Sequence, residues 1–233
     1  MSAQETRSDN SYFLFDNEII TQVDDQFFDQ NSTDTIDTAI GRGEAIFFST
    51  DEGEFVLRHY RRGGLPAKFL ADQYFGLSRA NSRAWREWHL LDELYRSGLP
   101  VPQPVAARVV SAGLLYRADL VMRRLQAQPV AEILLREPID PEQWNQLGET
   151  ISTFHQRGIY HADLNARNIM LGDDGRFYLI DFDRGEKRLS GGGWQQANLK
   201  RLRRSLDKFK ASHAPFYFSD SDWQQLLIGY QPH

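Results

Sequence analysis

The 233-residue chain contains no cysteine, which excludes disulfide bonds, thiol catalysis and cysteine metal sites. Its six histidines are scattered without ligand spacing, so we expect any bound metal to be a hard cation held by oxygen atoms. No apolar run approaches the roughly 20 residues that span a bilayer, and the polar start Met1–Glu5 does not resemble a signal peptide. We therefore expect a compact protein that stays in the cytoplasm.

Acidic residues are concentrated at the start of the chain. Residues 1–40 contain one Arg and nine acidic residues, a net charge of −8, whereas the whole chain carries −5, so the remaining 193 residues carry +3. A mildly basic body favours anionic ligands. No basic stretch is interleaved with aromatic residues as in a single-strand platform, so we expect no nucleic-acid partner. No obligate protein partner is evident either.

The residues that can carry chemistry are densest between residues 161 and 183. The segment begins with His-Ala-Asp-Leu-Asn-Ala-Arg-Asn at residues 161–168 and continues with two short apolar strands around Asp174-Gly175. It ends with a carboxylate at Asp181. An Asp-Gly turn folds two such strands into a hairpin, so Asn168 and Asp181 are expected at the same end of it.

This arrangement resembles the catalytic hairpin of protein kinases. In their pattern His-Arg-Asp-Leu-x-x-x-x-Asn, the Asp orients and deprotonates the acceptor hydroxyl, and the Asn and the Asp of Asp-Phe-Gly hold Mg²⁺. By this resemblance Asp163 is the catalytic base, and Asn168 and Asp181 are metal ligands. Each could instead be an ordinary capping or turn residue, but their order around a hairpin favours the kinase interpretation. Ala162 replaces the Arg that in protein kinases binds a phosphorylated activation loop, so we do not expect control by such phosphorylation. Asp183 replaces the Gly of Asp-Phe-Gly.

A second group of residues resembles the part of a kinase that holds the nucleotide phosphates. Gly41 and Gly43 lie in a turn between two strands, like a shortened Gly-rich loop, although Gly-x-Gly is also common in hairpins. Arg58 ends an apolar strand at the position of the kinase Lys, and its expected partner is Glu87 on a predicted helix at 79–94. Such an Arg could clamp phosphate oxygens and pair with Glu87. The alternative is a surface ion pair at a strand end.

The pattern as a whole predicts an α+β, protein-kinase-like fold with two lobes. Residues 1–34 are expected to form an acidic, partly irregular leader with one short strand and one short helix, its first dozen residues disordered. Residues 35–233 form the kinase-like domain. Its small lobe, to about residue 125, has five antiparallel strands and one main helix. Its large lobe, about 126–233, is reduced, mostly helical and carries the catalytic hairpin, with helices at 129–136, 141–157 and 198–211.

The predicted helix at 198–211 has an apolar face and a basic remainder. The basic residues are Lys200, Arg201, Arg203, Arg204, Lys208 and Lys210. They form either a solvated side of the large lobe or, with the turn at Arg61-Arg62, a cationic surface that faces anionic lipid.

Three segments carry a more specific resemblance: residues 161–171, residues 57–64, and Arg86-Glu87-Trp88 with residues 98–102. Together they resemble the bacterial 3-deoxy-D-manno-octulosonic acid (Kdo) kinases of the lipopolysaccharide-core kinase family, over residues 40–230. The resemblance implies ATP- and Mg²⁺-dependent phosphorylation of the 4-hydroxyl of Kdo on a Kdo-containing lipid A precursor. It also implies a peripheral protein on the cytoplasmic side of the Gram-negative inner membrane, whose surface is anionic.

Two alternatives are open. A lipopolysaccharide heptose kinase belongs to the same class, and only the resemblance distinguishes its sugar from Kdo. A nucleotide-binding, pseudokinase-like module is suggested by Arg58 and the short glycine turn. The presence of Asp163, Asn168 and Asp181 argues against that module, because binding alone does not need a full set of base and metal ligands.

Overall fold

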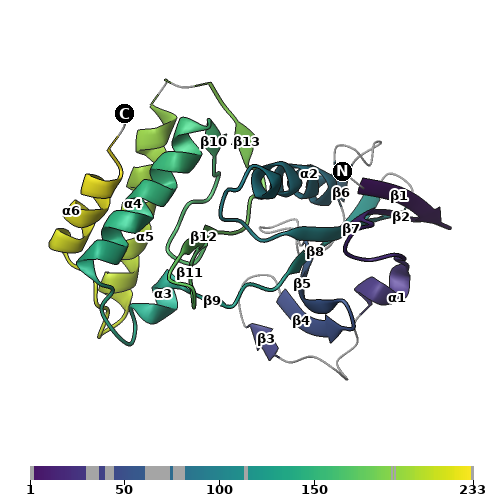
Figure 1. Cartoon of the computed structure of the whole chain (residues 1–233), viewed down its shortest axis with the longest axis horizontal. Helices are drawn as coiled ribbons and strands as arrows, with labels where there is room; N and C mark the ends of the chain where they lie inside the picture. Colours follow the sequence, from purple (N-terminus) through teal and green to yellow (C-terminus); the bar gives the residue numbers. More distant parts are fainter. Residues whose placement is uncertain are drawn as a thin grey trace. The chain divides into compact units, whose positions relative to one another are not determined.

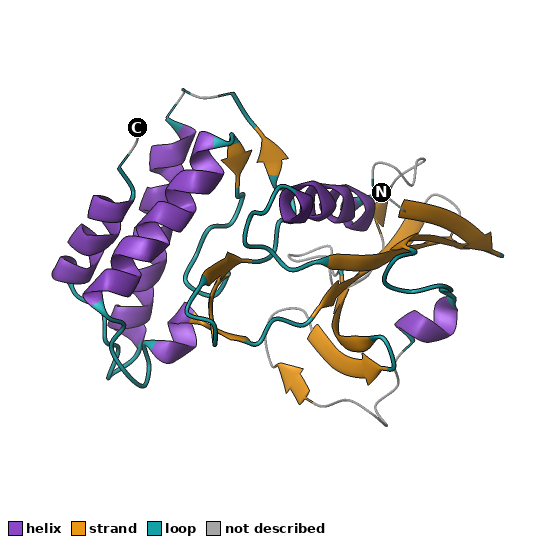
Figure 2. Ribbon diagram, viewed as in Figure 1, coloured by secondary structure: helices purple, strands orange, loops and turns teal. Residues whose placement is uncertain are grey.

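The computed structural model describes residues 3–29, 37–39, 45–60, 74–75, 82–112, 115–189, 191 and 193–231. It contains both helices and antiparallel strands (Figures 1 and 2). The chain divides into two compact units: unit 1 is Met1–Glu93 with Pro102–Arg124, and unit 2 is Leu94–Val101 with Leu125–His233.

Unit 1 is built on a sheet whose described strands number eight and pair antiparallel, in the order β1-β2-β7-β8-β5-β4-β3, with β6 paired to β8. The sequence predicts five of them, β3, β4, β5, β7 and β8, and does not predict β1, β2 and β6 as members of the sheet. The strands are β1 (Ala3–Ser8), β2 (Ser11–Asp16), β3 (Asp37–Ala39), β4 (Ala45–Thr50), β5 (Gly53–His59), β6 (Tyr74–Phe75), β7 (Pro104–Ala112) and β8 (Leu115–Arg123).

The acidic leader contributes two strands to this sheet, where the sequence predicts one short strand and a disordered start. β2 pairs with β7, and its Phe13 and Phe15 are buried in one apolar cluster with Ile20 and Phe28. β1 is exposed along its whole length and is held by backbone pairing to β2. Because β1 has no apolar alternation, its sequence carries no strand signal. The expected short helix is α1 (Asp25–Phe28).

The main helix of unit 1 is α2 (Arg83–Arg96), which extends into the first residues of unit 2. Its predicted apolar face is confirmed, because Trp85, Trp88, Leu91 and Leu94 are all buried. Spacings of three residues place these side chains on one side of the helix.

Unit 2 combines small sheets with four helices in its described part. A three-stranded sheet has the order β12-β11-β9, and β10 pairs with β13. These strands are β9 (Ala127–Pro129), β10 (Ile159–Tyr160), β11 (Ile169–Gly172), β12 (Phe177–Leu179) and β13 (Glu186–Lys187). The helices are α3 (Val130–Ile133), α4 (Pro141–Gln156), α5 (Trp194–Ser212) and α6 (Asp220–Gly229).

Three helices of unit 2, α3, α4 and α5, follow the sequence with changes at their ends, whereas the sequence does not predict α6. α4 starts as predicted, because Asp140 and Gln143 form a capping box and Pro141 occupies the first turn. α3 is shorter than predicted, and α5 starts four residues before the predicted Asn198, at Trp194, whose ring packs edge-on against His155. Within the described residues, we find no helix with the length and apolarity to cross a membrane.

Candidate active site

The predicted catalytic hairpin is present in unit 2. β11 and β12 pair antiparallel, with Ile169 opposite Leu179. At the far end Gly175 has a φ of +77°, which suits glycine, and its N–H donates to Gly172 O. At the near end the Ile180 N–H donates to Asn168 O over 3.0 Å. Asn168 and Asp181 therefore lie at the same end of the hairpin, as the sequence predicts.

His161 fixes the loop that precedes the hairpin. Its ring is buried; Nε2 lies 2.9 Å from Ile180 O, and Nδ1 lies 3.1 Å from the backbone nitrogen of Asp163. Because a carbonyl only accepts and a backbone N–H only donates, the ring carries its proton on Nε2 and is neutral. Burial lowers the pKa of His161, which maintains this state. The ring thus joins the loop to the end of β12.

The carboxylate of Asp163 is exposed and held by two partners. Arg201 Nη1 lies 3.1 Å from Oδ1, and Asn165 Nδ2 donates to Oδ2 over 3.0 Å. The Asp163 carbonyl accepts from Asn168 Nδ2 over 2.9 Å. The side chain of Asp163 is 57% exposed. An oriented carboxylate that is open to solvent is what a group acting on an incoming hydroxyl requires.

Asn168 and Asp181 offer oxygen atoms at the base of the hairpin. Since the Asn168 amide nitrogen donates to Asp163, its Oδ1 points in a different direction. Asp181 has a φ of +65°, a left-handed conformation that Asp tolerates better than most residues. The next residue, Phe182, is buried against His161 and Phe154. An amide oxygen and a carboxylate are ligands that suit Mg²⁺.

Buried polar groups connect the helices of unit 2 to the loop, and the sequence does not predict them. Asn198 on α5 donates to His161 O over 3.0 Å, and its Oδ1 accepts from His155 Nε2 at 3.3 Å. His155 Nδ1 lies 2.8 Å from the Tyr230 hydroxyl. Burial lowers the pKa of His155 to about 4. The sequence does carry one signal for Asn198: it is a polar residue on the apolar face of α5, four positions before Leu202.

In unit 1 the expected pair of Arg58 and Glu87 is in contact. Arg58 Nη1 lies 3.1 Å from Glu87 Oε1, and the Tyr60 hydroxyl donates to the other Glu87 oxygen. The Glu87 side chain is 1% exposed and that of Arg58 is 24% exposed, so the pair is mostly buried on the glutamate side. The predicted phosphate-binding glycines, Gly41 and Gly43, lie outside the described residues.

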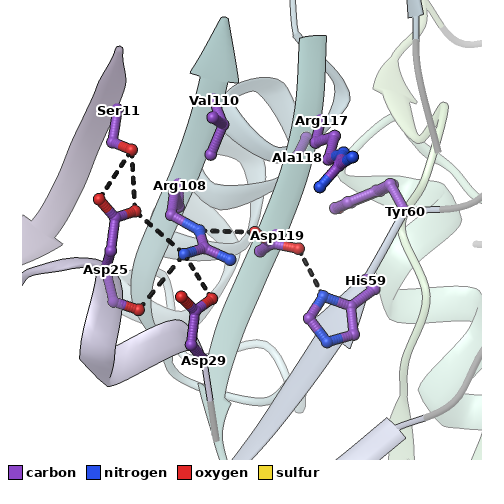
Figure 3. Close-up of a pocket in the computed structure, with 10 residues that line it drawn as sticks. All are labelled: Ser11, Asp25, Asp29, His59, Tyr60, Arg108, Val110, Arg117, Ala118 and Asp119. Atoms are coloured by element: carbon purple, nitrogen blue, oxygen red, sulfur yellow. Dashed lines mark hydrogen bonds and ion pairs between the residues drawn. The ribbon is translucent and has the colours of Figure 1, made fainter. Parts of the chain in front are cut away.

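Unit 1 also contains a cavity of about 380 Å³ that the sequence does not predict (Figure 3). The Arg108 guanidinium lies between carboxylates: Nε donates to Asp119 over 2.8 Å, and Nη1 donates to Asp25 and Asp29 over 3.0 and 2.8 Å. On the other side, Asp119 lies 2.6 Å from His59 Nδ1. The cavity is lined by Ser11, Asp25, Asp29, His59, Tyr60, Arg108, Val110, Arg117, Ala118 and Asp119.

The Arg108 network connects the leader to the sheet. Burial opposes its charge, but Asp119 and Asp29 outweigh this effect and raise the pKa of Arg108 above its ordinary value. Since its donors are directed at carboxylates from α1, β8 and the chain after α1, Arg108 has a structural role: it holds α1 against β7 and β8.

The basic residues of α5 have different surroundings in the structure. Arg201 contacts Asp163, and Arg203 pairs with Asp207 and Asp220 at 2.9 and 2.6 Å. The exposed remainder is Lys200, Arg204, Lys208 and Lys210. The other predicted cationic segment, Arg61-Arg62, lies outside the described residues.

Comparison with known proteins agrees with this geometry. The sequence model of the lipopolysaccharide kinase (Kdo/WaaP) family matches residues 26–230. A relative from Haemophilus influenzae (strain PittEE), named 3-deoxy-D-manno-octulosonic acid kinase, is 36% identical over 97% of this chain and 99% of its own. Relatives of the same name are 35% identical in Vibrio vulnificus (strain YJ016), over 95% of both chains, and 43% identical in Xylella fastidiosa (strain 9a5c), over 75% of this chain and 70% of that one. The chain therefore belongs to the lipopolysaccharide kinase (Kdo/WaaP) family and is an ATP-dependent phosphotransferase.

Proposed function

We propose that this chain transfers the γ-phosphoryl group of ATP to the 4-hydroxyl of Kdo on a Kdo-containing lipid A precursor, in the synthesis of the lipopolysaccharide inner core. The observation that carries the chemistry is the exposed, oriented carboxylate of Asp163, at a loop whose following hairpin brings Asn168 and Asp181 to one end. The names of the relatives support Kdo as the sugar.

In this proposal Asp163 accepts the proton of the acceptor hydroxyl as the phosphoryl group is transferred. Phosphoryl transfer depends mainly on positioning and charge stabilisation, and the two hydrogen-bonded oxygens of Asp163 supply the positioning. Asn168 Oδ1 and the Asp181 carboxylate would hold Mg²⁺, which when bound neutralises charge on the phosphate oxygens. His161 keeps these groups in register, because it bonds to both Asp163 and Ile180.

In unit 1 Arg58 would hold phosphate oxygens of ATP, with the backbone at Gly41 and Gly43 as a further clamp. Glu87 contacts Arg58 Nη1 and so orients the guanidinium, a planar group that suits phosphate oxygens. Unit 1 would then correspond to the small lobe of a protein-kinase-like fold, about residues 35–125 preceded by the leader. Unit 2 would correspond to the large lobe, about residues 126–233.

The acceptor in this proposal is anchored in lipid, so the protein would work at the cytoplasmic side of the inner membrane as a peripheral protein. The available attraction is between exposed cations and anionic lipids. Lys200, Arg204 and Lys208 are exposed and spaced four residues apart on α5, so they lie along one side of that helix.

The proposal is tested by mass spectrometry of the acceptor after incubation with protein, ATP and Mg²⁺. A Kdo-containing lipid A precursor should gain one phosphoryl group, and fragmentation should place it on the Kdo 4-hydroxyl. A parallel reaction with a heptose-containing core acceptor tests the heptose kinase alternative. If ATP binds but neither acceptor gains mass, the proposal is wrong.

A further inference from the structure

Arg201 reaches the proposed catalytic base from a distant part of the sequence. It lies on α5, 38 residues after Asp163, and its Nη1 is 3.1 Å from Asp163 Oδ1. Asn165 already orients the other oxygen, Oδ2. The Arg201 side chain is 44% exposed. An exposed guanidinium therefore stands beside the atom to which the acceptor hydroxyl must come.

A cation at this position is favourable for an anionic acceptor. Orientation of Asp163 does not need a full charge, since Asn165 supplies a neutral donor. Arg has five N–H donors in a planar fork that matches a carboxylate. It can keep one donor on Asp163 and offer the others to a second carboxylate.

Arg203, two residues further along α5, differs from Arg201 because its donors are already bonded to carboxylates within the chain. Its Nε bonds to Asp207 and its Nη2 to Asp220, so its donors are directed at carboxylates of the chain itself. The contact of Arg201 uses one nitrogen and one carboxylate oxygen. The rest of its fork is thus available to a ligand.

Resting on the proposed function, we propose that Arg201 binds the carboxylate of the sugar acid that is phosphorylated. In a ulosonic acid the carboxylate and the ring hydroxyls belong to one small ring system, within a few bond lengths of each other. A hydroxyl within hydrogen-bond reach of Asp163 therefore brings that carboxylate within reach of Arg201. The site would select 2-keto sugar acids over neutral sugars, because a neutral acceptor leaves the guanidinium without its partner.

The test pairs two acceptors with two variants. The acceptors are the detergent-solubilised Kdo-containing lipid A precursor and the same molecule with its Kdo carboxylate converted to the carboxamide. The wild type should lose about 10- to 100-fold in kcat/KM on the amide, as expected for a charged hydrogen bond. Arg201→Gln should show a similar loss of kcat/KM on the acid, caused by a higher KM for the acceptor. On the amide its kcat/KM should be almost the same as that of the wild type. Arg201→Lys should retain an intermediate preference for the acid, and KM for ATP should be unchanged in both variants.

Three results would overturn the inference while leaving the proposed function intact. The first is equal kcat/KM of the wild type on acid and amide, and the second is an Arg201→Gln variant that keeps the wild-type ratio of kcat/KM on acid to that on amide. The third is a fall in kcat alone that is equal on both acceptors. The last would make Arg201 only a positioning residue for Asp163. Arg136→Gln, which removes an exposed Arg elsewhere in unit 2, is the matched control and should behave as wild type. A wild type that leaves the acid acceptor unphosphorylated overturns the proposed function and this inference together.

Discussion

Among single residues, Asp163 is the one on which the proposed chemistry depends most. Asp163→Asn preserves the shape of the side chain but removes its ability to accept a proton. We expect kcat to fall by about 10²–10⁴-fold, the usual value of a positioned base. The affinity for Mg²⁺-ATP should change little, because Asp163 contacts the acceptor in this mechanism. Steady-state kinetics and a nucleotide titration on the same preparation measure the two effects.

Asp173→Asn is the matched control for that experiment. Asp173 is exposed near the turn of the hairpin, away from the end that carries Asn168. The variant should have wild-type kinetics. Wild-type turnover by Asp163→Asn would show that another group orients the acceptor hydroxyl.

The contact of Arg58 with Glu87 predicts a coupled pair. Arg58→Ala removes the proposed phosphate ligand, and Glu87→Ala removes the group that orients it, so both should raise KM for ATP. The double variant should lose less than the sum of the two, with a coupling of about 0.5–3 kcal/mol. A double-mutant cycle on kcat/KM for ATP measures this coupling. Strict additivity would mean that the pair does not act as one unit, and Arg58→Lys should retain partial activity.

The sequence predicts residues whose partners are close in sequence or set by a known pattern. Asp163, Asn168 and Asp181 follow from one short segment, because a hairpin turns its spacing into proximity. Arg58 and Glu87 follow from a pattern of strand and helix. The contacts of Arg201 with Asp163 and of Arg108 with α1 could not be found in this way, because the partners are far apart in the sequence and no local period records them.

At the scale of elements, the approach of α4 to α6 depends on two glycines. A Cβ atom on Gly148 would overlap the Leu226 carbonyl oxygen, and one on Gly229 would overlap the Asn145 carbonyl oxygen. Alanine normally stabilises a helix interior by about 1 kcal/mol relative to glycine. Here the overlap is with backbone, so we expect Gly148→Ala to destabilise the protein by about 1–3 kcal/mol, the usual cost of overpacking.

Urea unfolding of Gly148→Ala measures that cost. Gln146→Ala, at an exposed position of the same helix, is the control and should leave the stability within about 0.5 kcal/mol of wild type. If Gly148→Ala were more stable than wild type, α4 and α6 would not approach each other as closely as the structure has them.

The sequence predicts a helix or strand where burial of one face produces a periodic pattern of apolar residues. It does not predict a strand that forms only by backbone pairing with its neighbour. The faces of α2 and α4 show the helical period because one side of each is buried. β1 is formed by backbone hydrogen bonds to β2 and is exposed on both faces. The sequence places the start of α5 too late, because Trp194 packs against His155, a residue far away in the sequence.

For the whole molecule, the buried histidines predict how stability depends on pH. The pKa of His155 is about 4 in the fold and 6.5 for the ordinary group, so the unfolded chain binds a proton more readily. The stability from the neutral ring is present above pH 6.5 and is lost as pH falls towards 4. Between pH 7.5 and pH 5 this loss is about 2 kcal/mol. The pKa of His161 is shifted in the same direction.

His155→Gln isolates this contribution from that of other titrating groups. Gln cannot titrate, so the stability advantage of wild type over the variant should shrink by about 2 kcal/mol when urea unfolding is measured at pH 5 in place of pH 7.5. An advantage that is constant or grows over this range would contradict a buried, neutral His155.

The proposed binding to an anionic membrane is also a property of the whole molecule, and variants of α5 can test it. Lys200, Arg204, Lys208 and Lys210 are exposed, and each basic residue near an anionic surface contributes about 1 kcal/mol. Their joint change to Gln should therefore weaken cosedimentation with anionic vesicles by up to about a thousandfold. Wild-type binding should fall as salt is raised, because exposed charges are screened.

The matched control removes four charges elsewhere in unit 2. Arg136, Arg157, Arg176 and Lys187 are exposed and lie outside α5, and their change to Gln gives the same net charge. This control should bind vesicles much more strongly than the α5 variant, because attraction to a surface depends on where the charges lie within a Debye length of about 8 Å at physiological salt. Equal binding by the two quadruple variants would mean that total charge, and not the face of α5, sets the attraction. If both bound as tightly as wild type, the basic side of α5 would be only a solvated surface.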